Sequence, residues 1–163
     1  MKVLVVSHNC FSSVQSMGKT LSSLFAEFGK DELMQLYLYP SIPNVDICGS
    51  YYRITDSDIL RSILKRKRCG RKVGQDEIKQ DNSLFADSKE AEKYSSVKRN
   101  SFLMRRLRDI AWKFSNWKTG DLKEWLKTEN PDVVFYALGD ATFSQNIARW
   151  VSKYLEIPLV TYI

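Results

Sequence analysis

The feature that most constrains the fold of this chain is a short, continuous apolar run at its start. Residues 2–7 read KVLVVS, which is typical of a strand buried on both faces of a parallel sheet. Comparable runs recur at residues 33–39, 51–55, 131–138 and 158–163. Several intervening segments have helical apolar spacing, and parallel strands need such crossovers. The sequence therefore predicts an α/β fold: a Rossmann-like, mostly parallel sheet with helices on both faces.

The helices are predicted from apolar residues spaced three or four positions apart. The first stripe consists of Met17, Leu21, Leu24, Phe25 and Phe28. Gly29 is placed to end that helix. A later stripe, which we expect to face the core, consists of Leu103, Leu107, Ile110, Phe114 and Trp117. Polar residues that suit helix starts are Thr55 or Asp56, Asp121 with Glu124, and Thr142 with Gln145.

Residues 70–98 differ in character from the rest of the chain. They are polar, mixed in charge and weakly periodic, so we expect a poorly ordered excursion on the surface. With 163 residues, 44% of them apolar, the chain suits a single globular domain. It stops inside its final apolar strand, and from this we expect 1–163 to be a fragment of a longer polypeptide with a second domain.

The basic residues are concentrated in two segments of a chain whose net charge is +6. Residues 61–72 carry seven Lys or Arg and no acid, and residues 98–118 carry seven more against one Asp. Such clusters either attract anionic partners, such as nucleic acid, phospholipid or a phosphorylated ligand, or form a solvated face. The sequence leaves both interpretations open.

The cysteines and the apolar runs exclude several classes of protein. Cys10, Cys48 and Cys69 are irregularly spaced, and with His8 as the single histidine they form neither a zinc site nor a disulfide framework. We therefore expect no metal, no cofactor and a reducing, cytoplasmic location. No apolar run approaches the roughly 20 residues that span a bilayer, so we expect any membrane contact to be peripheral.

Candidate binding residues follow from the position of the strands. In open α/β sheets, ligands bind at the carboxyl ends of the strands, beside the switch in strand order. The first strand ends at His8 and Asn9, and the strand over 131–138 is followed by Gly139, Asp140 and Thr142. His8 can orient a substrate or act as a base near neutral pH, or simply be hydrogen-bonded at a strand end. Asp140 can contact a ligand or cap the following helix.

The segment SHNCFSSVQSMGKT, residues 7–20, has the outline of a phosphate-binding loop. That motif requires a glycine five residues before Gly18, where this chain has Ser13, and the serine Cβ hinders the tight wrap around a phosphate. Gly18 nevertheless stands where a backbone can approach a ligand closely, at the positive end of a helix. Lys19 can neutralise a phosphate or face water.

Four segments together resemble the first half of bacterial glycosyltransferases with two Rossmann-like domains, the GT-B architecture. They are MKVLVVSHNCFSSVQSMGKTLSSLFAEF, LMQLYLY, SYYRITD and PDVVFYALGDATFSQNIARWVSKYLEIPLVTYI. The resemblance is greatest to capsular and cell-surface polysaccharide enzymes. It implies that this half mostly binds the acceptor, that a C-terminal domain holds the nucleotide-sugar, and that transfer occurs between them. Gly18 matches the family's glycine near the donor phosphates. Gly139 and Asp140 stand where relatives often place a histidine.

The resemblance implies an acceptor-side domain that serves sugar transfer from a nucleotide-sugar to a growing surface polysaccharide or a lipid-linked acceptor. We expect the chain alone to be inactive, to bind no nucleic acid, and to contact the anionic inner face of the membrane through its basic segments. One alternative is a nucleotide-binding enzyme whose Mg²⁺-dependent ATP or GTP binding is lost in Lys19→Ala. Another is a nucleic-acid-binding module, for which the candidate stacking residues are Trp112, Trp117 and Trp125.

Overall fold

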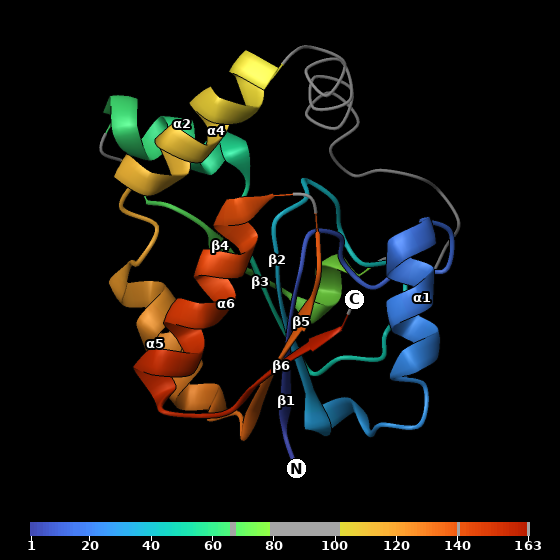
Figure 1. The fold of residues 1–163 in the computed structure, drawn as a ribbon. Helices are drawn as coiled ribbons and strands as arrows, with labels where there is room; N and C mark the ends of the chain where they lie inside the picture. Colours follow the sequence, from blue (N-terminus) through green and yellow to red (C-terminus); the bar gives the residue numbers. More distant parts are fainter. Residues whose placement is uncertain (66–67, 79–101, 140, 163) are drawn as a thin grey trace.

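The computed structural model describes residues 1–65, 68–78, 102–139 and 141–162, and Figure 1 shows their arrangement. The strands are β1 (Val3–Ser7), β2 (Leu33–Tyr37), β3 (Ser50–Arg53), β4 (Arg71–Val73), β5 (Val133–Ala137) and β6 (Leu159–Tyr162). The helices are α1 (Ser16–Leu24), α2 (Asp56–Lys65), α4 (Phe102–Phe114), α5 (Gly120–Glu129) and α6 (Thr142–Leu155). Short 3₁₀ turns, η1 (Lys30–Glu32) and η2 (Gln75–Glu77), precede β2 and follow β4. The predicted α/β class is confirmed.

Within the described residues, the strands form one sheet in the order β4-β3-β2-β1-β5-β6. All neighbouring strands are parallel except β4, which pairs antiparallel with β3. β1 lies at the centre, where Val3 is paired with Leu33 of β2 on one side and with Val133 of β5 on the other. The chain therefore builds the sheet outward from β1 in one direction and then in the other.

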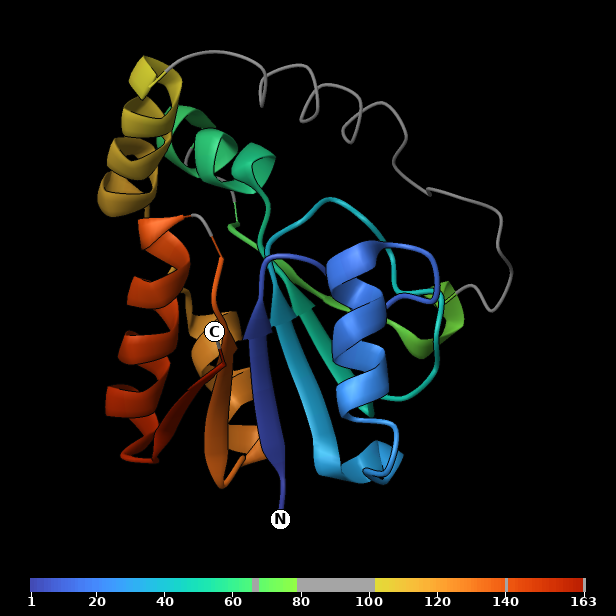
Figure 2. The ribbon, with the colours of Figure 1, turned by 45° about the vertical axis from the view of Figure 1, so that its right-hand side comes forward.

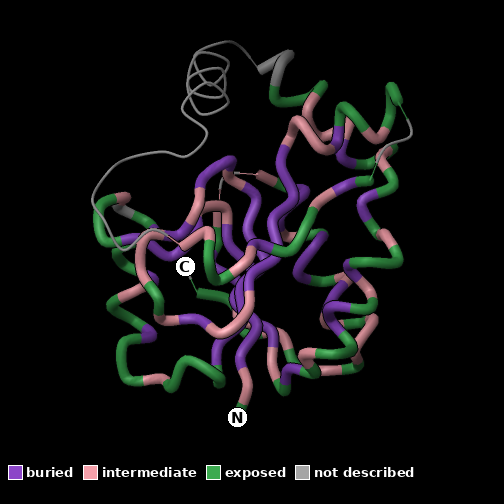
Figure 3. Tube along the Cα trace, turned by 180° about the vertical axis from the view of Figure 1, so that it is seen from behind, coloured by how far each residue is buried: buried purple, intermediate pink, exposed green. Residues whose placement is uncertain are grey.

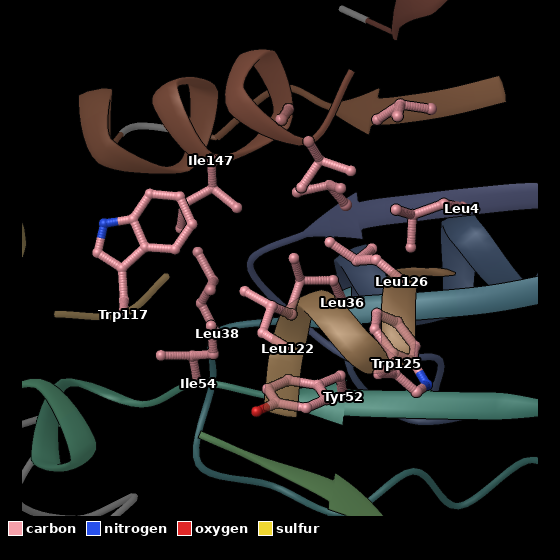
Figure 4. Close-up of a cluster of buried hydrophobic side chains, with 14 of the residues drawn as sticks. Leu4, Leu36, Leu38, Tyr52, Ile54, Trp117, Leu122, Trp125, Leu126 and Ile147 are labelled. Atoms are coloured by element: carbon pink, nitrogen blue, oxygen red, sulfur yellow. The ribbon is translucent and has the colours of Figure 1, made fainter. Parts of the chain in front are cut away.

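One face of the sheet is covered by α5 and α6 (Figure 4), and Trp112 of α4 adds to the same core. Trp125 of α5 is fully buried and donates a hydrogen bond from its indole nitrogen to Ser50 Oγ at 2.7 Å. Trp112 stacks on Phe143 of α6 with ring centroids 4.4 Å apart. These tryptophans belong to the core, which removes them as stacking platforms for nucleic acid.

The opposite face is covered by α1 and by the segment after β2, as Figure 2 shows for the helix. Phe11, from the loop after β1, is fully buried there and meets Phe25 and Tyr51 edge to face. Helices thus cover both faces of the sheet, as the sequence predicts. The carboxyl ends of β1 and β5 therefore lie between the helices that cover the two faces of the sheet.

The end of α1, the exposure of its apolar stripe and the cap of α5 differ from the prediction. α1 ends at Leu24 and does not continue to Gly29; Phe25 is its C-cap and turns back to contact Phe28. Of the predicted apolar stripe, Leu21 and Phe25 are buried, whereas Met17 and Leu24 are exposed. The cap of α5 is Thr119, whose side chain accepts from Leu122 N, and not Asp121.

The N-caps of α2 and α6 can also be compared with the predicted ones, which were Thr55 or Asp56 for α2 and Thr142 for α6. Thr55 is the capping residue of α2: its hydroxyl accepts from Asp58 N at 3.2 Å, and the Asp58 carboxylate accepts from Thr55 N at 2.9 Å. In α6 the N-cap is Ala141, and Thr142 is the first helical residue. The predicted cap at Thr142 is therefore wrong.

The predicted excursion over 70–98 is wrong at its start. Gly70 has φ +80°, and this left-handed residue turns the chain so that Arg71–Val73 pair with β3 as the edge strand β4. Glu77 anchors the strand through two hydrogen bonds from the Arg71 guanidinium, at 2.7 and 2.8 Å. The rest of the predicted excursion, from residue 79 onward, lies outside the described residues.

The predicted core stripe over 103–117 is wrong in its middle part, whereas its last residue, Trp117, is buried in the core as predicted. Leu107 and Ile110 are half exposed and Phe114 is 75% exposed, whereas Trp112 is buried. The reason is the size and the polar handle of Trp112, which fills the space beside Phe143 and donates a hydrogen bond to Asp56. As a result, Leu107, Ile110 and Phe114 lie on the side of α4 that faces away from the core.

Candidate functional site at the carboxyl edge

The switch in strand order lies between β1 and β5. The chain leaves β1 for α1 on one face of the sheet and leaves β5 for α6 on the other face (Figure 1). In open α/β sheets, ligands bind at the carboxyl ends of the strands beside such a divergence. A Cβ placed on Gly139 would lie 3.9 Å from His8 Cβ, so the two turns are in contact. The sequence-based expectation that they are neighbours is confirmed.

His8 is half-buried at this edge and is held from the β2 side. Its backbone carbonyl accepts from Leu38 N at 3.1 Å. Its ring meets Tyr39 in an edge-to-face contact with centroids 5.8 Å apart. Tyr39 thus packs against one side of the His8 ring, although it was not predicted as a site residue. Both Tyr39 and the Gly139 turn are thus neighbours of His8.

A buried amide fixes the backbone of the β1 loop. Gln35, fully buried in β2, donates from Nε2 to Ser7 Oγ at 2.8 Å and to the carbonyl of Asn9 at 3.2 Å. Its Oε1 accepts from Phe11 N at 3.1 Å. Asn9 therefore contributes its carbonyl to the scaffold. Gln35 was not predicted, and its signal in the sequence is a single polar residue inside the apolar run LMQLYLY.

The loop before α1 folds inward on the protein itself. Cys10, Phe11 and Ser12 are buried, and Ser12 Oγ accepts from the amides of Val14 and Gln15, both at 3.2 Å. The hydroxyl thus satisfies two backbone donors near the start of α1, a position that a phosphate oxygen takes in an anion-binding loop.

Gly18 is buried against this loop. A Cβ on Gly18 would collide with the carbonyl oxygen of Cys10 and would lie 2.8 Å from Ser12 Cβ. The sequence predicted a close backbone approach at Gly18, and that approach exists, but its partner is the chain's own loop. Lys19 is exposed on the outer side of the same helix turn.

The start of α6 is set by a buried serine. Ser144 Oγ donates to the carbonyl of Ala141 at 2.7 Å and shares a 2.7 Å hydrogen bond with the Tyr136 hydroxyl of β5. This pair holds the first turn of α6 close to the end of β5, and Thr142 begins the helix. The positive end of the helix dipole is thereby fixed at the carboxyl edge. Asp140 lies outside the described residues.

The titratable groups beneath the edge are structural. Burial raises the pKa of the Cys10 thiol to about 11, and its sulfur lies 3.1 Å from Ser41 Oγ. Burial also raises the pKa of Tyr37, whose hydroxyl donates to the carbonyl of Ser41 at 2.8 Å. A thiol with that pKa stays protonated at neutral pH and is a poor nucleophile. The mostly buried Arg53 donates to the same carbonyl from Nη1 at 3.4 Å.

Comparisons with protein-family models, with curated proteins and with solved structures gave no match. Among the described residues, no group of three or more His, Cys, Asp or Glu is arranged to hold a metal ion. No helix among them is long and apolar enough to cross a membrane. The His8 imidazole and the start of α6 lie at the carboxyl edge, and both kinds of group can bind a polar, anionic molecule.

Proposed function

We propose that this chain is the acceptor-side domain of a glycosyltransferase with two Rossmann-like domains, of the class that builds capsular or cell-surface polysaccharide. The observation that carries the proposal is the contact between His8 and Gly139. Residues 1–28 and 131–163 carry most of the sequence resemblance. Although they lie far apart in the chain, they form adjacent strands and one carboxyl edge.

The groups at this edge suit a phosphorylated saccharide. An imidazole both donates and accepts hydrogen bonds, and the ring of Tyr39 beside it supplies an apolar surface for a sugar ring. The start of α6, at Thr142, favours negative charge such as an acceptor pyrophosphate. The nucleotide-sugar would come mainly from a second domain, so the chain alone transfers no sugar. Three free, buried cysteines agree with a cytoplasmic location.

The nucleotide-binding alternative has less support. A triphosphate cradle needs backbone amides that are open to a phosphate, whereas here Ser12 Oγ already accepts from the amides of Val14 and Gln15. The exposed Lys19 is then a surface residue with little effect on binding.

The test is amide NMR of the isotope-labelled chain, titrated separately with a polyprenyl pyrophosphate-linked sugar and with ATP and Mg²⁺. We expect the lipid-linked sugar to shift the amides of His8, Asn9, Gly139 and Thr142. The variant His8→Ala should weaken this binding, and Lys19→Ala should leave it unchanged. Saturable ATP binding that Lys19→Ala abolishes would replace the proposal by the nucleotide-binding alternative. Turnover of any nucleotide-sugar by the purified chain would refute the division of labour between two domains.

A further inference from the structure

The two edges of the sheet differ in how well they are protected against pairing with another strand. β4, at one edge, has two charged residues among its three, and its Arg71 is held by Glu77. β6 forms the other edge, and within the described residues its one neighbouring strand is β5. The four residues of β6, Leu159–Tyr162, are uncharged, and the last three are exposed (Figure 3). Proteins usually protect a sheet edge with charge, a bulge or a covering segment, so an edge of this kind is suited to strand pairing.

The pairing of β6 with β5 shows which of its backbone groups face outward. The carbonyls of Pro158 and Tyr162 accept hydrogen bonds from amides of β5 and of the residue that follows it, at 2.9 and 3.0 Å. In a parallel ladder, the groups that bond to one neighbouring strand belong to alternate residues. The N–H and C=O groups of Leu159 and Thr161 therefore point away from the sheet. This edge presents two donors and two acceptors to another strand.

The side chains of β6 alternate between the two faces of the sheet. Leu159 packs against the core on the face that α6 covers. Val160 and Tyr162 belong to the α1 side, where the Tyr162 ring stacks on Phe135 with centroids 6.0 Å apart. Both nevertheless remain 48% and 45% exposed. The edge thus combines outward backbone groups with apolar side chains that a further strand can cover.

We propose that β6 pairs antiparallel with β6 of a second copy of this chain, about a two-fold axis at Val160. In this register Leu159 lies opposite Thr161 of the second copy, and the reverse holds on the other side of the axis. Every outward donor of one copy then meets an outward acceptor of the other, which gives four hydrogen bonds. Val160 lies opposite its own counterpart on the α1 side. The strand is therefore complementary to itself, as a two-fold interface requires.

The charge and the size of this edge set the strength of the dimer. Residues 157–162 carry no charge, so the axis brings no like charges together, and the basic segment 61–72 lies in α2 and β4, toward the opposite edge of the sheet. Pairing over one short strand buries far less than the roughly 1,200 Å² of a standard interface. We therefore expect a weak, reversible dimer with a dissociation constant of about 0.1–1 mM. This inference is independent of sugar transfer.

The test is sedimentation velocity of the complete 163-residue chain over a concentration range of about 0.01–1 mM, in which we expect a shift from monomer toward dimer. Val160→Lys should raise the dissociation constant at least about tenfold, because it places like charges directly opposite each other. The matched control Val14→Lys makes the same change at a valine that is 47% exposed elsewhere, and it should dimerise like the wild type. Thr161→Pro removes an outward N–H that the β5 ladder does not use, so it should also dissociate the dimer.

A second measurement tests the register without adding charge to the edge. Opposite residues of a non-hydrogen-bonded antiparallel pair have Cα atoms about 4.5 Å apart, which suits a disulfide. Mild oxidation should therefore cross-link Val160→Cys into a covalent dimer. Tyr162→Cys should cross-link far more slowly, because Tyr162 lies opposite Pro158 of the second copy in this register. The three native cysteines are buried.

Three results would each overturn the proposal. The first is a wild-type chain that stays monomeric at about 1 mM. The second is a loss of dimer in Val14→Lys as large as in Val160→Lys, and the third is cross-linking of Tyr162→Cys as fast as that of Val160→Cys. Species larger than a dimer would contradict it as well, because pairing about a two-fold axis closes the assembly.

Discussion

Replacing Gly18 by alanine would force a methyl group into the contact between α1 and the loop after β1. The new Cβ would meet the carbonyl oxygen of Cys10 and would lie 2.8 Å from Ser12 Cβ and 3.1 Å from Ser12 N. Two of these three atoms belong to the backbone, which cannot rotate aside as a flexible side chain can. The loop or the helix must therefore shift.

Overpacking of this kind costs about 1–3 kcal/mol. Alanine in place of glycine inside a helix returns up to about 1 kcal/mol. The net loss in the free energy of unfolding should be about 1–2 kcal/mol. For a domain of this size that corresponds to a fall in Tm of roughly 2–8 °C.

The assay is thermal unfolding followed by circular dichroism, with Gly120→Ala as the matched control. Gly120 is the first residue of α5, and a Cβ there meets nothing within 4 Å, so this variant should unfold at or slightly above the wild-type temperature. Lys19→Ala should also leave the Tm within a degree or so. If Gly18→Ala has the same Tm as Gly120→Ala, the close contact between Gly18 and the loop does not limit side-chain size, and the account of this loop is wrong.

Three further perturbations test the scaffold. Gln35→Leu leaves a buried loop amide without its acceptor and should lower the free energy of unfolding by about 1–3 kcal/mol in urea titration; an unchanged midpoint would contradict the bridging role. Asp56→Ala removes the acceptor of the buried Trp112 indole and should cost a similar amount, whereas Asp56→Asn should retain most of the stability. The hydrogen bonds from Arg71 are the largest cause that lowers the pKa of Glu77, to about 2, from 4.5. The stabilisation from this pair is therefore present above pH 4.5 and lost as the pH falls toward 2, so the protection factors of the β4 amides against hydrogen exchange should fall over that range in the wild type but not in Glu77→Gln.

The contact between the two site turns could be predicted from the sequence because it follows from topology alone. Two apolar runs that each end in small or polar residues become adjacent wherever their strands are neighbours, and His8 and Gly139 needed no side-chain detail. Gln35 could not be assigned because its three partners come from the backbone path of a loop, which periodicity does not describe.

The orientation of α4 could not be predicted for a related reason. Apolar spacing identifies a helix, but which of its faces packs on the core depends on the side chains that the core offers as partners. Trp112 has a stacking partner in Phe143 and a hydrogen-bond acceptor in Asp56, and both lie in distant parts of the sequence. β4 was missed because its three residues include two charged ones and its position is set by the turn at Gly70.

The central position of β1 has a consequence for synthesis on the ribosome. Its first edge is closed by β2, which begins at Leu33, but its second edge is closed by β5, which begins at Val133. At about 5–20 residues per second, translation takes roughly ten seconds to deliver β5 after β1 has emerged. Throughout that interval the nascent chain carries an unpaired apolar strand edge, the feature most prone to wrong pairing. A chaperone that shields β1 until β5 has emerged would thus protect this edge from wrong pairing throughout the interval.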